Sequence, residues 1–205
     1  MSRFLIDIYF ENGKWKAGME ELKPCIPGAR LSVDEEALAA EDKYRDNGAC
    51  HYPCSVKKCK KDIHSICPAC YLLGAMGLPG FVKVPFLYAE GTADELYSSR
   101  IDRATQTVVT GTNRPYELVP DGKVFEGKLT VLTEDTVLGW KLGGPRDVGE
   151  KMTLGDKWLK DSKGKMNIGE TDDFMKTFIL DRLTAIKTLG GYKSKGFGLV
   201  DISLV

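Results

Sequence analysis

The sequence has no long apolar run and no excess of charge of either sign. No stretch approaches the roughly 18 consecutive apolar residues of a membrane-spanning helix, so we expect no membrane partner. Twenty-nine basic residues balance 29 acidic ones, which excludes nucleic-acid binding by bulk positive charge alone. Any nucleic-acid site must therefore be a local patch of basic side chains.

The N-terminal stretch, residues 1–16, lacks the small-residue cleavage site of a secretory signal peptide. We therefore expect a cytoplasmic protein, in which the six cysteines are metal ligands or reduced thiols rather than disulfides. The composition, 42% hydrophobic and 28% charged residues, excludes global disorder and is ordinary for a soluble globular protein. A length of 205 residues fits a single domain, 1–205, with insertions.

The first two thirds of the chain predict mainly strands. A period-two apolar alternation that ends at the turn Asn12-Gly13 predicts the first strand and comprises Phe4, Ile6, Ile8 and Phe10. A short acidic helix is predicted over residues 31–45. Two further strands are predicted over 81–88 and 123–132, because β-branched and aromatic residues alternate there.

The C-terminal third predicts the longest helix. Thr171 can act as its N-cap, and Asp172 and Asp173 lie in the first turn, where the helix dipole favours negative charge. The apolar stripe of this helix is Phe174, Phe178, Leu183, Ile186 and Leu189. Gly190-Gly191 ends the helix, and residues 197–205 predict a closing strand.

This order of elements predicts an α+β fold of the modified ferredoxin-like or RRM-like kind, with a long helix packed on an antiparallel sheet. Three segments interrupt the fold. They are a metal-binding insertion at about 48–75, a polar hairpin at about 98–122, and a flexible insertion at about 141–170 that is rich in Gly, Lys and Asp.

A block of cysteines gives the strongest chemical signal. Cys54, Cys59, Cys67 and Cys70 form a Cx4C and a CxxC pair, and two such pairs supply the four ligands of tetrahedral zinc. Cys50 or His64 can replace one of the first pair, whereas Cys25 lies well outside the block. Residues 50–70 contain too few aliphatic side chains to order themselves by burial, which also favours a bound metal.

Two other interpretations of the cysteines remain open. Disulfides are disfavoured in the cytosol, and a redox role for Cys67-Pro68-Ala69-Cys70 needs a parallel strand that the pattern does not predict. Zinc held by four cysteines keeps no position for water. The predicted zinc is therefore structural.

Two segments carry basic residues beside glycine or aromatic residues. The glycine-rich segment 189–200 contributes Gly191, Lys193, Lys195, Gly196 and Phe197, and the hairpin contributes Arg103 and Arg114. Glycine allows close approach to a phosphate backbone, and lysine neutralises its charge. The alternatives are a helix C-cap followed by a turn for the first segment and a solvated surface loop for the second.

Taken in order, four motifs resemble proteins of the RAMP superfamily, and most closely the Cas seven family of type III CRISPR effector backbones. They are Ile26-Pro27-Gly28-Ala29-Arg30-Leu31, then Cys67 through Gly74, then Ile101-Asp102-Arg103 through Gly122, and finally Leu189 through Gly198. The resemblance runs from about residue 26 to the C-terminus.

The resemblance implies an RRM-like palm, a zinc-bearing insertion and a β-hairpin thumb, in a subunit that stacks with other RAMP or Cas subunits along a CRISPR guide RNA and positions target RNA. It implies that Arg30 meets guide phosphates, that Arg103 and Arg114 lie in or beside the thumb, and that Lys193 and Lys195 lie in a phosphate-binding loop.

Catalytic relatives carry an aspartate in the loop that corresponds to residues 12–25, and this sequence has none there. We therefore expect a non-catalytic guide-RNA-binding subunit. The alternatives are a metal-dependent endoribonuclease that uses Glu20 or Glu21, and a zinc-ribbon adaptor that binds only protein.

Overall fold

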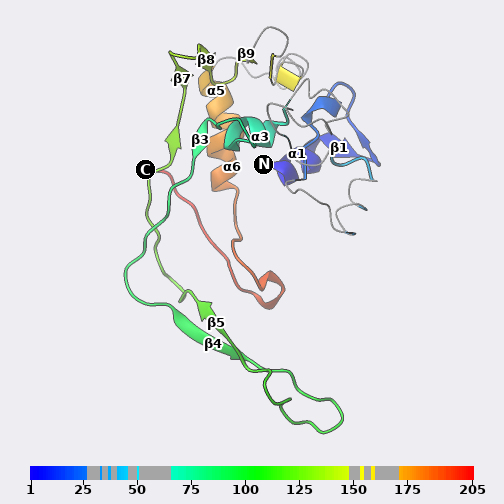
Figure 1. Ribbon diagram of the computed structural model, residues 1–205, viewed down its shortest axis with the longest axis vertical. Helices are drawn as coiled ribbons and strands as arrows, with labels where there is room; N and C mark the ends of the chain where they lie inside the picture. Colours follow the sequence, from blue (N-terminus) through cyan, green and yellow to red (C-terminus); the bar gives the residue numbers. More distant parts are fainter. Residues whose placement is uncertain are drawn as a thin grey trace. The chain divides into compact units, whose positions relative to one another are not determined.

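The computed structural model describes residues 1–26, 33, 37, 41–45, 50, 66–147, 153–154, 158–159 and 171–205. The chain forms two compact units. Unit 1 comprises Met1–Lys83 and Val131–Val205, and unit 2 comprises Val84–Thr130 (Figure 1). The predicted acidic helix at 31–45 lies almost entirely outside the described residues.

Unit 1 combines short helices with two-stranded antiparallel pairs. Its helical segments are α1 (Ser2–Tyr9), η1 (Glu20–Leu22), α3 (Pro68–Leu73), α5 (Thr171–Met175), η2 (Lys176–Leu180), α6 (Asp181–Thr184) and η3 (Lys193–Lys195). Its strands are β1 (Phe10–Glu11), β2 (Lys14–Trp15), β3 (Val82–Lys83), β7 (Glu134–Asp135), β8 (Trp140–Lys141), β9 (Arg146–Asp147) and β10 (Thr153–Leu154). β1 pairs with β2, β7 with β8 and β9 with β10. This mixture fits the predicted α+β class.

Aromatic side chains from segments far apart in the sequence form the core of unit 1. Tyr71 of α3 contacts Phe81, Trp158 and Phe174, with ring centroids 5.0, 5.3 and 6.0 Å away. Phe174 stacks on Phe178 at 4.7 Å. All five side chains are at most 1% exposed, so this cluster holds α3 against the helical run that begins at Thr171.

The first predicted strand is wrong, because residues 2–9 form helix α1. Leu5 is fully buried and Ile8 is 44% exposed, which is not the pattern of a strand with its even positions on the core face. The ring of Phe4 lies against Tyr9 and beneath the guanidinium of Arg182, 3.6 Å from the ring centroid. A run with apolar residues at most positions satisfies either period, and packing against α6 selects the helix.

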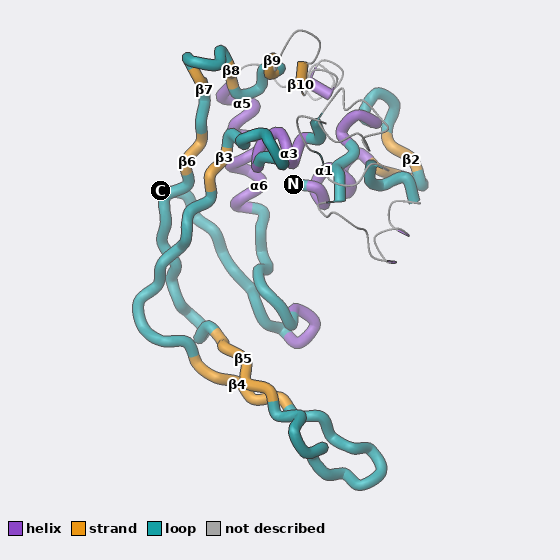
Figure 2. Tube along the Cα trace, viewed as in Figure 1, coloured by secondary structure: helices purple, strands orange, loops and turns teal. Residues whose placement is uncertain are grey.

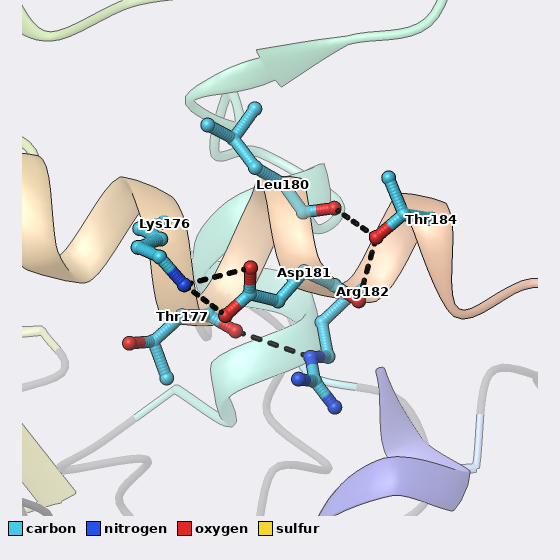
Figure 3. Close-up of polar contacts among 6 residues, drawn as sticks. All are labelled: Lys176, Thr177, Leu180, Asp181, Arg182 and Thr184. Carbon is cyan, nitrogen blue, oxygen red and sulfur yellow. Dashed lines mark hydrogen bonds and ion pairs between the residues drawn. The ribbon is translucent and has the colours of Figure 1, made fainter. Parts of the chain in front are cut away.

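The predicted C-terminal helix is present, but it ends earlier and contains a π turn. It runs without a break through α5, η2 and α6, and Ala185 is its C-cap. In the π turn the five-residue spacing brings the Lys176 ammonium to both oxygens of Asp181, at 3.0 and 2.9 Å. By the same spacing, Arg182 Nε donates to the carbonyl of Thr177 at 3.1 Å (Figure 3).

The other predicted strands are much shorter than expected. Among the residues of 81–88, only Val82 and Lys83 are in a strand, since Pro85 offers no backbone N–H. Among 123–132, strand β6 covers Thr130–Val131, and the closing segment has a single bridge between Thr188 and Leu199. Gly198, with a positive φ of 80°, interrupts the closing segment.

The interpretation of 141–170 as a mobile insertion is wrong for its described part. Leu142, Arg146, Trp158 and Leu159 are at most 4% exposed, and strands β9 and β10 lie in this stretch. The abundance of Gly, Lys and Asp concealed the few side chains that pack. Residues 148–152, 155–157 and 160–170 lie outside the described residues.

Unit 2 consists of an antiparallel ribbon with long connections (Figure 2). Strand β4 (Asp94–Ser98) pairs with β5 (Arg114–Leu118), with Asp94 opposite Leu118 and Ser98 opposite Arg114. We call residues 94–118 the hairpin arm, and the hairpin predicted in this region is present. No residue of unit 2 is buried.

Candidate metal centre

Four cysteine thiols from three separate segments converge in unit 1. Cys25 follows Pro24, and Cys50 comes from a second segment. Cys67 is the N-cap residue of α3, and Cys70 lies in the first turn of that helix. The four Sγ atoms all lie within 4.8 Å of one another. Cys25 Sγ lies 3.4 Å from Cys70 Sγ and 3.7 Å from Cys67 Sγ.

The spacing of these sulfurs fits one tetrahedral metal ion. With metal–sulfur bonds of about 2.3 Å, the edge of a tetrahedron of thiolates is about 3.8 Å. Soft thiolates select zinc-like cations over magnesium or calcium. The donor set can therefore hold a single ion of this kind with small adjustments of the side chains.

The start of α3 shows why the CxxC pair forms half of the site. Cys67 has the extended backbone of an N-cap residue, and Pro68 occupies the first helical position, where its missing N–H costs nothing. The backbone N–H of Cys70 points at Cys67 Sγ, 3.5 Å away. One helical turn thus brings both sulfurs to the same side, and backbone N–H groups support the thiolate charge.

Burial and hydrogen bonding separate the four thiols. Cys67 is fully buried and Cys70 half-buried. Hydrogen bonds from Cys25, Cys50 and Cys70 hold the pKa of Cys67 well below its usual value. Hydrogen bonding to Cys25 is the main cause that raises the pKa of Cys50 and of Cys70, and hydrogen bonding to Cys50 lowers the pKa of Cys25. A metal ion binds thiolates, so a cation that enters the cluster replaces the protons of its thiols.

The structure brings together two of the four predicted ligands, Cys67 and Cys70. Cys54, Cys59 and His64 lie outside the described residues. The exclusion of Cys25 is wrong, because its sulfur lies 3.4 Å from Cys70 Sγ and 3.7 Å from Cys67 Sγ, within the four-sulfur cluster. Sequence spacing misses a ligand that lies 42 residues before its partner. The only signal in the sequence was the position of Cys25 between Pro24 and Pro27, because proline restricts the backbone conformation.

The predicted RNA-binding arginines of the hairpin arm are both exposed. Arg114 lies in β5, and Arg103 lies in the turn at the far end of the arm. Asp102 shapes that turn by accepting hydrogen bonds from the backbone N–H groups of Ala104 and Thr105, at 2.8 and 3.0 Å. Those bonds lower the pKa of Asp102. Arg30 lies outside the described residues.

The other predicted RNA-binding residues lie together in the C-terminal loop, residues 190–197. Tyr192 and Gly196 take left-handed backbone conformations on either side of η3, which displays Lys193 and Lys195 to solvent. The Lys195 ammonium is 4.9 Å from the Tyr192 ring centroid, and Phe197 meets the same ring edge-on at 6.4 Å. At the base of the loop, Leu189 N–H donates to the carbonyl of Gly198 at 2.8 Å.

The alternative interpretation of this loop as a helix C-cap is wrong. The helix ends at Thr184, and the Gly190-Gly191 pair follows only after the segment 185–189. Backbone hydrogen bonds from Leu189 to Gly198 and from Val200 to Lys187 make the segment a separate hairpin-like loop. Its glycines therefore serve the loop and not the end of the helix.

The fold and this site define an α+β protein with four cysteines placed to hold one metal ion. No protein-family model matches the chain, and no curated protein matches it. Within its described residues, no helix combines the length and the apolar character that crossing a bilayer requires.

Proposed function

We propose that this chain is a guide-RNA-binding backbone subunit of a multisubunit CRISPR ribonucleoprotein, of the RAMP superfamily and the Cas seven type. The four ordered motifs support this function, and so does the exposure of both basic segments. The proposal includes an RRM-like palm, a thumb formed by the hairpin arm, and other RAMP or Cas subunits as neighbours. A cytoplasmic location accompanies it, because reducing conditions keep the four thiols available for metal.

The metal in this proposal is a structural zinc ion held by Cys25, Cys50, Cys67 and Cys70. Zinc supplies a rigid junction between segments that are distant in the sequence, and four thiolates exclude a water ligand. Zinc binding thereby orders the chain that leads into α3. It takes no part in RNA chemistry.

The observation that carries the RNA proposal is the construction of the loop 190–197. Its base is held by backbone hydrogen bonds, its backbone turns at Gly196, its two lysines are exposed, and the Tyr192 ring contacts both Lys195 and Phe197. Such a loop offers cations and a stacking surface, the two features that bind single-stranded RNA without reading its sequence.

Replacing Lys193 and Lys195 with alanine tests the proposal. Binding of a fluorescein-labelled single-stranded RNA to the purified chain is measured by anisotropy over a series of salt concentrations. Each lost phosphate contact reduces the slope of log K against log salt by about 0.7 on a single strand. We expect weaker binding, a slope reduced by about 1.4, and an unchanged unfolding midpoint.

The matched control replaces Lys14 and Lys16, two exposed lysines near the turn between β1 and β2, and removes the same charge elsewhere. It should leave the salt slope unchanged. Wild-type affinity and slope in the Lys193/Lys195 variant would overturn the RNA-binding role of the loop.

A second candidate function is a zinc-containing adaptor that binds protein, and the surface of unit 2 favours it. Phe86, Tyr88 and Val124 are 85%, 74% and 69% exposed, which is unusual for large apolar side chains outside an interface. Unchanged RNA binding in the Lys193/Lys195 variant would favour this adaptor.

A further inference from the structure

The core of unit 1 contains a buried cation. Arg146 of β9 is 1% exposed, and its guanidinium carbon lies 4.6, 4.7 and 5.3 Å from the ring centroids of Phe81, Tyr71 and Trp140. Burial lowers its pKa to about 10, so the side chain keeps its charge at neutral pH. Among the described residues, no carboxylate forms an ion pair with it.

Carbonyl groups take the place of a carboxylate partner. Arg146 Nη1 donates to the carbonyl of Pro79 at 2.5 Å, and Nη2 donates to the carbonyl of Tyr71 at 2.7 Å. Nε is buried without a hydrogen bond in the described structure. A buried charge is costly unless opposite charge or strong hydrogen bonds compensate for it, and two carbonyls and three ring faces are weak compensation.

The contact with Tyr71 connects this cation to the cysteines. Tyr71 directly follows Cys70, and its backbone N–H donates to the carbonyl of Cys67 at 2.8 Å. At about 1.5 Å of rise per residue, Cys67 and Tyr71 are roughly 6 Å apart along the axis of α3. Arg146 thus donates a hydrogen bond to the same helical turn that carries two of the four thiols.

The metal centre carries the negative charge that no described carboxylate supplies to Arg146. Four thiolates around one divalent cation carry a net charge of about −2, and low-polarity surroundings screen it weakly. The aromatic core between α3 and β9 provides such surroundings.

We propose that Arg146 is a positioning residue of the metal centre. Its guanidinium holds the turn Cys67–Tyr71 by the Tyr71 carbonyl, and its buried charge offsets the net negative charge of the metal-bound thiolates. This role rests on the structural zinc proposed above.

Three variants separate charge, packing and general stability. Arg146→Lys keeps the charge, Arg146→Met keeps most of the apolar contact without charge, and Tyr71→Phe is the matched control. The control removes the Tyr71 hydroxyl, which accepts a hydrogen bond from Gly143 N–H and donates one to the Gly144 carbonyl. It leaves the Tyr71 carbonyl, to which Arg146 donates, in place. Arg146→Gln serves as a second uncharged variant if Arg146→Met does not fold.

The readouts are zinc affinity by competition with a chromophoric chelator, the visible spectrum of the Co²⁺-substituted protein, and the unfolding midpoint. We expect Arg146→Met or Arg146→Gln to weaken zinc binding about tenfold or more and to change the Co²⁺ thiolate bands. Arg146→Lys should restore the affinity to within about threefold of the wild type. Tyr71→Phe should lower the unfolding midpoint and leave zinc affinity unchanged.

Equal zinc affinities in the charged and uncharged variants would overturn the proposal, and so would a Tyr71→Phe variant that loses zinc as strongly as Arg146→Met. Absence of zinc binding in the wild-type protein would instead overturn the zinc centre itself. The wild-type measurement therefore distinguishes the two failures.

Discussion

The thiols of the metal centre occupy unequal positions. Cys25 Sγ lies within 3.7 Å of both cysteines on α3, and its side chain is 4% exposed. Cys70 is half-buried. Since Cys25 is contributed by a segment distant from α3, its loss removes a ligand and also the cross-link between the two segments.

We expect Cys25→Ser to lower the zinc content of the purified protein from about one ion per chain to well below that value, because serine is a poor zinc ligand at neutral pH. Metal analysis by mass spectrometry measures the content. Cys59→Ser is the control and should keep the full content, because Cys25, Cys50, Cys67 and Cys70 already supply four ligands. Full zinc in Cys25→Ser together with loss in Cys59→Ser would restore the ligand set predicted from spacing.

At the same scale, the sequence could predict Cys67 and Cys70, because two ligands in one helical turn have a recognisable spacing. Cys25 and Arg146 could not be predicted in this way. Their roles depend on which segments the fold brings together, and neither residue has a local pattern that reveals a distant partner. An arginine in a polar, glycine-rich stretch is ordinarily on the surface.

Among the elements, the helical run 171–184 was predictable at its start and unpredictable at its end. The acidic first turn is a strong local signal, and Phe174 and Phe178 are buried as the stripe predicts. The predicted N-cap role of Thr171 is not seen, because Thr171 is the first residue of α5 and its hydroxyl donates to the carbonyl of Leu142 at 3.3 Å. Farther along the stripe, Leu189 is 48% exposed. A local period continues regardless of whether a core lies opposite it, so periodicity alone does not locate the end of the helix.

The short strands and helix α1 show the same limitation. Residues 4–10 satisfy two periods, and packing that includes the burial of Leu5 and the contact between Phe4 and Arg182 selects the helix. Strand pairing depends on partners distant in the sequence and is cut short at Pro85 and at Gly198 of the closing segment. The hairpin arm was predictable because its two strands are close in the sequence.

The uneven burial of the stripe predicts unequal effects of truncation. Phe178→Ala should lower the free energy of unfolding by about 3–5 kcal/mol, because it leaves a cavity between Trp158 and Phe174. Leu189→Ala should change it by less than about 1 kcal/mol. Urea denaturation followed by tryptophan fluorescence measures both. Equal losses would mean that the stripe is buried along its whole length, as the sequence predicts.

At the scale of the whole molecule, the two units differ in the burial of their residues. Unit 1 contains the buried core, the cysteines and Arg146. Unit 2 has no buried residue, and a two-stranded ribbon alone contributes little stability. The free energy of folding therefore comes mainly from unit 1.

Removal of the hairpin arm tests this division. Residues 94–118 are replaced by Asn-Gly, a dipeptide that joins two paired strands in a tight turn. The flanking residues Ala93 and Val119 adjoin the pair Asp94 and Leu118, and the reciprocal hydrogen bonds between Tyr88 and Glu126, both 2.9 Å, remain to hold the ends together. The shortened protein should keep about one zinc ion per chain, because all four thiols lie in unit 1. Its free energy of unfolding should stay within about 1 kcal/mol of the wild type.

RNA affinity of the shortened protein should fall, and the double variant Arg103→Ala/Arg114→Ala in the full-length chain should reproduce that fall if the two arginines carry the binding. Loss of zinc or of cooperative unfolding in the shortened protein would show that unit 1 depends on the hairpin arm and would refute the division.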